Sequence, residues 1–296
     1  MLLLTLVWGS SFILIKKSLY VFLPRHIVLL RIIIAGLVLS WYVPRASTQV
    51  KGKDWLYLGV FASLTLLLPS ILMVTAQVFI DSFVNGILNS LTPLMTLLVG
   101  VVLYRQPIRN PQIAGLLIGL VGTAFFMGAL ADHRFAGVNL YASMTVMATL
   151  FHALGLNVLQ RYLSHLHPGV VATLAHILLL PVAVVLFVIG GGLMQDFHDV
   201  EVWRALMYLL VLGVVGNALG LTLYGQLVLF KGPVFASTVT YLMPIVILMW
   251  GLADAETVTL PQVLATVVIM VGVWLTGNGR TSHRGNSANK QPESAN

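Results

Sequence analysis

Ten stretches of about twenty mostly apolar residues follow one another along this chain, separated by short polar connections. A helix needs about 20 such residues to cross the hydrocarbon core of a bilayer. The stretches cover residues 2–20, 25–43, 55–76, 82–104, 109–130, 138–160, 168–190, 204–229, 234–253 and 258–277. They leave little of the 296 residues for anything else. The sequence therefore predicts an all-α membrane protein with ten transmembrane helices and no soluble domain.

The composition excludes several other classes of protein. Hydrophobic residues make up 58% of the chain and charged residues only 8%, whereas soluble domains carry about 25% charged residues. A soluble enzyme, a nucleic-acid-binding module and a disordered protein are therefore excluded. Continuous apolar runs such as 97–103 do not alternate as the strands of a transmembrane barrel do. Cysteine is absent, which excludes disulfides and thiolate metal sites.

Basic residues are unevenly divided between alternate loops. With the N-terminus placed inside, the inner loops and tail carry Arg45, Lys51, Lys53, Arg105, Arg109, Arg161, Lys231, Arg280, Arg284 and Lys290, and the outer loops carry Lys16, Lys17, Arg25, Arg134 and Arg204. Because cytoplasmic loops are enriched in Lys and Arg, we expect a multi-pass protein of the cytoplasmic (inner) membrane with both termini cytoplasmic. The net charge of +7 then reflects topology, and no nucleic-acid partner is expected.

Lys16 and Lys17 go against this distribution, because the topology places both on the outer side. Two roles are open for them. Their side chains either snorkel outward to the membrane surface or line a pore.

The two halves of the chain resemble each other. Asn89–Pro93 matches Thr240–Pro244, with the prolines 151 positions apart, and Gln106–Gln112 matches Glu256–Gln262 at an offset of 150. Each half holds five spans, and an odd number places the second half upside down relative to the first. Inverted repeats are typical of secondary transporters, whose binding sites lie near the midplane where the repeats meet.

The same offset matches Gly122 with Gly272. We therefore predict a first repeat over residues 1–134 and a second over 135–277. Residues 278–296 are polar and rich in Gly, Ser and Asn, and are expected to form a disordered cytoplasmic tail.

Several sequence motifs of this chain resemble those of a known family. Trp8–Phe12, then a proline loop, then Leu30–Gly36 are similar to the EamA-type members of the drug/metabolite transporter superfamily, as are the proline-centred fourth and ninth spans. The resemblance covers almost the whole chain. It implies ten helices in two inverted five-helix repeats, cytoplasmic termini, and movement of small metabolites, often outward.

This chain departs from the family pattern at two positions. The turn after the fourth span usually carries a Glu, and here it carries Gln106, whereas the second copy keeps Glu256. The counterpart of Trp8 in the sixth span is His152. The motifs identify the superfamily but not the substrate, since its members handle amino acids, sugars, nucleotide sugars and drugs.

One polar stripe is predicted in the fourth span. It consists of Ser82, Asn85, Asn89, Thr92 and Thr96, which recur at helical spacing on an otherwise apolar helix. Unpaired amides are costly in lipid, so this stripe must face protein or water. Two interpretations are open: the wall of a substrate cavity, or hydrogen bonding between helices at about 0.6–2 kcal/mol per contact.

Other candidate substrate-binding residues come from four further spans. They are Trp8, Ser11, His152, Asn217, Tyr224, Thr240 and Tyr241. Asn217 and Tyr224 are seven residues apart and so share a helix face. Trp8 and Tyr224 could instead be interfacial belt residues. His152 and His176 could bind substrate or exchange protons, or simply pack.

Arg31 is the one basic residue placed inside a span. Charges in the membrane are costly and are often functional, so Arg31 is expected to bind a substrate carboxylate or an outer-gate carbonyl. The alternative is an anchor that snorkels to the outer surface. Pro93 and Pro244 are candidate gating or helix-breaking positions, because each removes a backbone hydrogen bond; a static kink is the alternative.

The predicted function is transport of small metabolites by alternating access between the two repeats. Export of amino acids or related compounds is expected, since polar Asn and Thr groups lie beside Trp and Tyr. No GxSxG, HExxH, paired carboxylates or Walker loop is present, so we expect no enzyme, no catalytic residues, no cofactor and no metal. The alternatives are a membrane-embedded enzyme or a non-transporting scaffold. The expected partners are a small-molecule substrate and the lipid bilayer, and the oligomeric state stays open.

Overall fold

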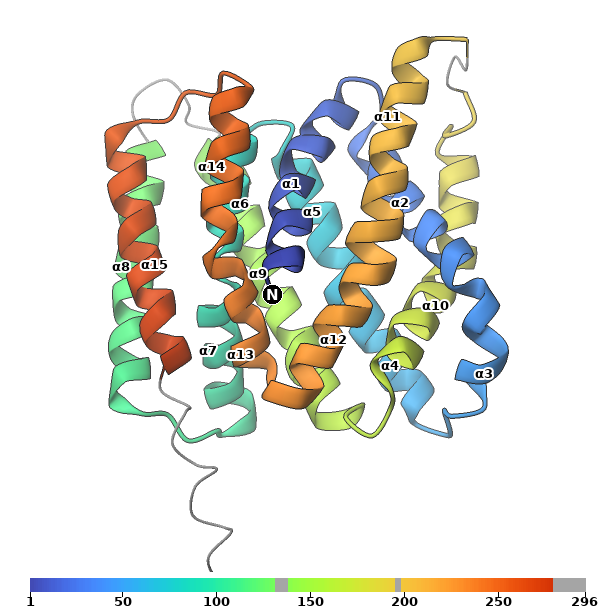
Figure 1. The fold of residues 1–296 in the computed structure, drawn as a ribbon, viewed down its shortest axis with the longest axis horizontal. Coiled ribbons are helices and arrows are strands. Elements are labelled where there is room, and N and C mark those ends of the chain that lie inside the picture. The colour runs from blue at the N-terminus through green and yellow to red at the C-terminus, as the bar shows by residue number, and fades with distance from the viewer. Residues whose placement is uncertain (131–137, 195–197, 279–296) are drawn as a thin grey trace, which may run out of the picture.

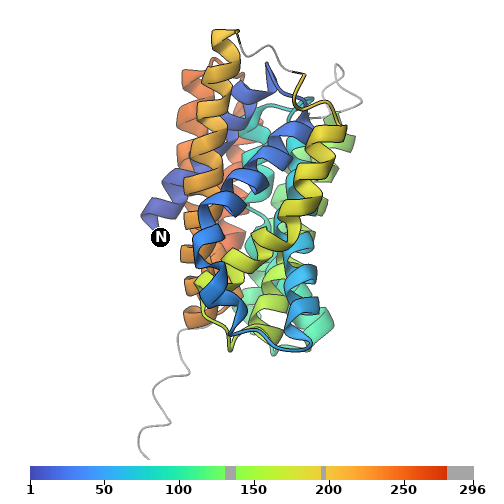
Figure 2. The same cartoon turned by 90° about the vertical axis from the view of Figure 1, so that its right-hand side faces the viewer.

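A computed structural model of the protein describes residues 1–130, 138–194 and 198–278, and the regular elements in these ranges are all helices. Most of them run roughly along one common direction, and their connections gather at two opposite ends (Figures 1 and 2). The expectations for Asp132, Arg134, Asp196 and the tail after Asn278 concern residues outside the described ranges.

The first half of the chain contains the elements that lead from the N-terminus to the left edge of Figure 1. They are α1 (Leu2–Leu19), α2 (Pro24–Leu39), η1 (Ser40–Tyr42), α3 (Val43–Ser47), α4 (Asp54–Ala62), η2 (Ser63–Leu67), α5 (Leu68–Ala76), α6 (Ser82–Asn89), α7 (Thr92–Tyr104) and α8 (Asn110–Leu130).

The second half repeats this pattern of long and interrupted helices. Its elements are α9 (Val138–Tyr162), α10 (Pro168–Ile189), α11 (Val200–Val211), η3 (Leu212–Leu219), α12 (Gly220–Lys231), α13 (Pro233–Ser237), η4 (Thr238–Tyr241), α14 (Met243–Ala253) and α15 (Leu260–Asn278). The helix at α11 begins four residues earlier than the sequence predicted, which brings Glu201 into its first turn.

Seven helical stretches of the described residues are long and apolar enough to cross a membrane. Three shorter apolar helices, over Asn110–Phe126, Met243–Ala253 and Leu260–Thr276, accompany them. Many large apolar side chains are exposed on the outside of the bundle, for example Val185 and Ile189 on α10. Such a surface suits lipid rather than water, so the chain is a multi-pass membrane protein.

The fourth predicted span is interrupted next to Pro93, a position that the sequence marked as a candidate helix break. It ends at Asn89 and restarts at Thr92, because Pro93 has no N–H to donate to the Asn89 carbonyl. Thr92 Oγ1 donates to that carbonyl instead, at 2.7 Å. Pro244 similarly stands in the first turn of α14. Both prolines therefore start a new half-helix, where proline is tolerated.

Two π-helical turns, which we call the wide turns, interrupt the third and eighth apolar stretches. The π-helical segments η2 and η3 lie at corresponding places in the two halves, about 150 positions apart. The left-handed residues Arg105 (φ 50°) and Ala255 (φ 56°) are also 150 positions apart, and each ends a helix. The repeated local geometry is thus more extensive than the repeated sequence motifs.

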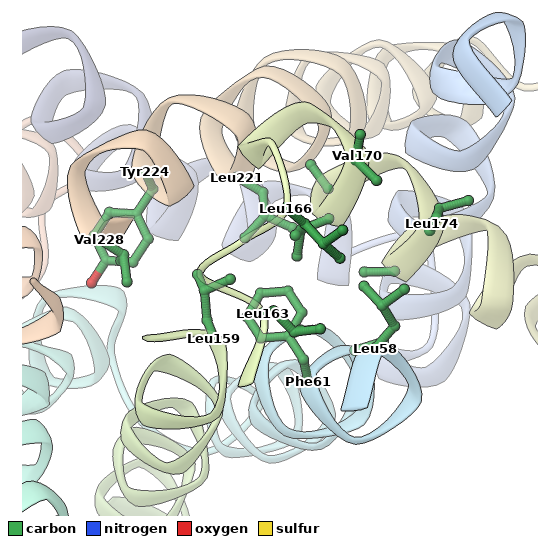
Figure 3. Close-up of a cluster of buried hydrophobic side chains, with 14 of the residues drawn as sticks. Leu58, Phe61, Leu159, Leu163, Leu166, Val170, Leu174, Leu221, Tyr224 and Val228 are labelled. Carbon is green, nitrogen blue, oxygen red and sulfur yellow. The ribbon is translucent and has the colours of Figure 1, made fainter. Parts of the chain in front are cut away.

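The largest of the buried apolar clusters joins α4, α9, α10 and α12 (Figure 3). Its members include Leu58, Phe61, Leu159, Leu163, Leu166, Val170, Leu174, Leu221 and Val228. Tyr224 lies at one edge of this cluster in Figure 3, and its hydroxyl is at the end of the ring that points away from its own backbone. The cluster thereby fixes the position of a side chain that also belongs to the cavity described below.

Charged residues at one end of the bundle form an ion-pair cluster, which we call the Lys16 cluster. Lys16 Nζ contacts Glu256 Oε1 at 2.7 Å and Asp254 Oδ2 at 2.8 Å, and Lys17 pairs with Asp254. Glu256 also accepts hydrogen bonds from the backbone N–H groups of Ser82 and Phe83 at the start of α6. Both lysines therefore pair with acids, a role that the sequence did not predict.

Candidate functional site

A cavity of about 150 Å³ lies between helices of both halves. It is bordered by α1, α2, η2 and α5, α6, α9, η3 and α12. The sequence-predicted residues that line it are Trp8, Ser11, Arg31, Asn85, Asn89, Thr92, His152, Asn217, Tyr224 and Thr240. Residues from distant parts of the chain therefore meet at one site, as the sequence analysis expected for a substrate cavity.

Aromatic rings form one wall of this cavity. The rings of Trp8 and Tyr224 meet edge to face with centroids 4.8 Å apart, and the His152 ring lies 6.1 Å from that of Tyr224. The Tyr224 hydroxyl is buried without a hydrogen-bond partner among the described residues. This geometry does not fit interfacial belt residues, because both rings face the interior of the bundle.

Each wide turn presents its backbone to an aromatic ring nitrogen from the other half. Trp8 Nε1 donates to the carbonyl of Gly216 in η3 at 3.0 Å. His152, the counterpart of Trp8, lines the cavity next to the backbone of Thr65 in η2. Because π-helical turns shift the backbone pairing, they are often found at functional sites. One contact runs from the first half to the second and the other from the second half to the first.

The polar stripe of the fourth span is divided in the structure. Asn85 is fully buried: its Nδ2 donates to Met73 O and Gln77 Oε1, both at 3.0 Å, and its Oδ1 accepts from Thr145 Oγ1 at 2.7 Å. Asn85 thus forms hydrogen bonds with neighbouring helices while it also lines the cavity, and its contact with a substrate stays a prediction.

The two ends of the stripe lie away from the cavity. Ser82 Oγ donates to Glu256 in the Lys16 cluster, and Thr96 Oγ1 donates to the Thr92 carbonyl at 2.6 Å. Asn85, Asn89 and Thr92 line the cavity from both sides of the interruption before Pro93, and Ser82 and Thr96 do not line it.

Arg31 lines the cavity, and its side chain does not snorkel to the outer surface. Arg31 Nη2 donates to Asn217 Oδ1 at 2.7 Å, which joins α2 to η3. Its Nε is buried without a hydrogen-bond partner among the described residues. This contact favours a role of Arg31 at the cavity over the anchor interpretation, and the guanidinium keeps an N–H donor without a partner among the described residues.

The remaining candidate residues differ in whether they line the cavity. Ser11 Oγ donates to Val7 O at 2.8 Å, within its own helix. His176 is buried, with Nδ1 at 2.8 Å from Ala172 O, and is not part of the cavity lining. Pro93 and Pro244 shape the half-helices without lining the cavity. The side chain of Tyr241 lies outside the described residues.

One side of the cavity, at α5, is lined by residues that the sequence did not identify as candidates. Ser70, Met73 and Gln77 line it. The signal was present, because Ser70 and Gln77 are seven residues apart on one helix face, the same spacing that identified Asn217 and Tyr224. Within the described residues, no group of three or more His, Asp or Glu side chains is placed to hold a metal ion.

Comparisons with known proteins agree with this geometry. The EamA-like transporter family profile matches residues 1–128 and again residues 139–278. Over 161 residues the chain is 25% identical to an uncharacterized transporter of Archaeoglobus fulgidus, covering 52% of this chain and 55% of that protein. The match therefore spans about half the length of that relative.

One solved structure, described only as the crystal structure of a protein, superposes with a TM-score of 0.58. The superposition covers 92% of this chain and 95% of the other at 18% identity, which shows a shared fold and nothing more. The family match, in contrast, covers most of the chain in two consecutive copies. The chain belongs to the EamA-like transporter family, and its long apolar helices are those of a multi-pass membrane protein.

Proposed function

We propose that the protein exports amino acids or related small metabolites, and that the substrate binds in the cavity beside Trp8 and Tyr224. The observation that carries this proposal is the cavity itself, where polar side chains and an aromatic wall from both halves face one space. An amphipathic metabolite needs both kinds of contact.

We propose alternating access between two inverted five-helix repeats as the mechanism. The matched wide turns η2 and η3, the matched half-helix starts at Pro93 and Pro244, and the crossed contacts of Trp8 and His152 support this proposal. Discontinuous helices at the middle of the membrane are typical of secondary transporters. On this proposal the three shorter apolar helices complete ten spans.

We propose that the protein lies in the cytoplasmic (inner) membrane with both termini in the cytoplasm. The loops α3–α4, α7–α8, α9–α10 and α12–α13 gather at the lower end in Figure 1. These loops and the helix ends beside them hold Arg45, Lys51, Lys53, Arg105, Arg109, Arg161 and Lys231. The excess of basic residues at this end supports a cytoplasmic orientation.

Energy coupling is proposed to be exchange or facilitated diffusion. The cavity lining contains no Asp or Glu within the described part of the chain. Proton-driven transporters relay protons on buried carboxylates or histidines, so proton coupling here would depend on His152. If transport by His152→Gln keeps the pH-gradient dependence of the wild type, such a relay is contradicted.

Transport in liposomes tests the proposed function. Purified protein should move radiolabelled amino acids with saturable kinetics, and unlabelled substrate on the opposite side should accelerate the flux. Asn89→Phe places a bulky ring in the cavity and should abolish this flux, whereas Val102→Phe on the exposed face of α7 should leave it unchanged. A chemically altered solute would favour an enzyme, and absence of saturable flux for every amino acid would contradict the substrate proposal.

A further inference from the structure

We infer that the cavity binds small organic monocarboxylates, and that Arg31, positioned by Asn217, binds the carboxylate group. This inference rests on the proposed function, because it names the substrate class of the same cavity. It concerns a subsite between α2 and η3, on the side of the cavity where the guanidinium lies.

The charge of the cavity lining is the first argument. Arg31 is the one Lys, Arg, Asp or Glu side chain among the described residues that line the cavity. Its hydrogen-bond partner Asn217 is neutral, so the guanidinium charge is not compensated there. Arg31 is half-buried and its Nε is fully buried, so part of its charge is removed from water without a counter-ion, which is unfavourable. An anionic ligand would supply the missing charge.

The free donors of Arg31 are the second argument. A guanidinium carries five N–H donors in a planar fork that matches a carboxylate. Asn217 Oδ1 accepts from Nη2, and Nε is buried without a partner in the described part of the structure. A ligand oxygen could therefore be bound by a charge-assisted hydrogen bond. One fixed positive charge matches a monoanion, whereas a phosphate dianion would leave an excess negative charge.

The local backbone explains why Arg31 and Asn217 meet. Gly213 lies one turn before Asn217 in η3, and a Cβ there would come within 2.6 Å of Ile34 and 3.3 Å of the Arg31 carbonyl. Glycine therefore allows α2 to pack directly against η3. The two polar side chains are positioned by this close packing, although 186 residues separate them in the sequence.

The rest of the cavity lining determines which group can be attached to the carboxylate of the ligand. Trp8, Tyr224, Met73 and Leu221 form a mostly apolar lining around the subsite. A volume of about 150 Å³ admits an apolar body on the scale of a benzene ring. The geometry thus fits a carboxylate attached to a small aromatic or branched apolar group.

Phenylacetate and phenylacetamide provide a matched pair of probes, because they share shape and differ in charge. Calorimetry on detergent-purified protein should show phenylacetate binding at least about tenfold more tightly than the amide, the scale of one charge-assisted hydrogen bond. Arg31→Gln should remove this preference. Arg25→Gln makes the same charge change at the outer end, where Arg25 donates to Gly190 O, and should preserve it.

Asn217→Asp tests the inference without removing the arginine. The new carboxylate would sit where Asn217 Oδ1 now accepts from Arg31, so it should occupy the guanidinium and abolish phenylacetate binding while the melting temperature stays the same or rises. Equal affinity of the wild type for both probes, no phenylacetate binding at tens of millimolar, or an unchanged preference in Asn217→Asp would each overturn the inference.

The transport assay separates this inference from the proposed function. Carboxylate binding without flux in liposomes would contradict transport and leave the subsite intact. Saturable flux with no preference for carboxylates in the wild type, or with a carboxylate preference that Arg31→Gln retains, would contradict the subsite and leave transport intact.

Discussion

At the scale of single residues, the sequence predicted which side chains face the cavity but not what they contact. Arg31 and Asn217 were both identified as candidates, yet neither spacing nor motif links two residues in α2 and η3. Local periodicity gives the face of a helix, whereas the partner on another helix depends on tertiary packing. The same holds for Gly122 and Gly272, which the repeat matched and the structure places on the packed pair α8 and α15.

Gly272→Ala should destabilise the protein strongly. A Cβ at this position would lie 2.4 Å from Gly119 N and 2.7 Å from Gly115 O, and backbone atoms cannot move aside cheaply. We expect a loss on the order of 1–3 kcal/mol, typical of overpacking, seen as a lower melting temperature. Gly59→Ala is the matched control, because no atom lies within 4 Å of its Cβ and alanine is the better helix former. Equal melting temperatures for both variants would show that α8 and α15 are not closely packed.

At the scale of elements, apolar runs predicted the helices well but not their interruptions. The interruption before Thr92 follows from Pro93, which the sequence had marked as a candidate helix break. The wide turns η2 and η3 could not be predicted, because a π-helical turn has no distinct composition in segments such as Ser63–Leu67. The Lys16 cluster was also hidden, since it joins the end of α1 to the α14–α15 connection.

Glu256 should make the fold sensitive to acid. Burial raises the pKa of its carboxyl, but hydrogen bonds from Lys16, Ser82 and the Phe83 backbone outweigh burial, and the pKa lies below its usual range. The unfolded chain therefore binds this proton first as pH falls. Its stabilisation is complete above about pH 5 and is lost as pH falls through the lowered pKa. Asp254, whose pKa burial raises but Lys16 and Lys17 lower, acts in the same direction.

Glu256→Gln should lower the free energy of unfolding at neutral pH by about 1–3 kcal/mol, the scale of hydrogen bonds to charged groups. It should also make stability fall less steeply as the pH is lowered into the acid range. Burial and the charge of Glu256 raise the pKa of Asp81, so this carboxyl contributes a trend of opposite sign. Melting temperatures between pH 7 and pH 3 measure both effects. Glu201→Gln, which removes an exposed ion pair with Arg204, should change little. A Glu256→Gln curve parallel to the wild type would exclude this role.

At the scale of the whole molecule, the sequence predicted the family and the membrane class, both now confirmed. Repeats of sequence gave only a few matched positions, whereas the structure adds the pairs η2 with η3 and Arg105 with Ala255. Backbone geometry is retained when side chains diverge, so the similarity of the halves is clearer in the fold. The membrane orientation stays a prediction based on charge.

Single-cysteine labelling measures that orientation directly, because the chain contains no native cysteine. Cysteines at Lys51 and Arg105 should react with an impermeant thiol reagent only from the cytoplasmic side, and a cysteine at Asp199 only from outside. The positive-inside rule gives the reason. Labelling of Asp199→Cys from the cytoplasmic side would reverse the topology.

Accessibility of the cavity from each side of the membrane tests the mechanism most directly. Asn89→Cys lies in the cavity, half-buried, and Val102→Cys on the exposed face of α7 serves as the control. In separate inside-out and right-side-out vesicles, an impermeant thiol reagent should modify Asn89→Cys from both sides. The most rapidly transported solute should slow both reactions, and Val102→Cys should stay inert. Reaction from one side alone, or no reaction from either, would contradict alternating access through this cavity.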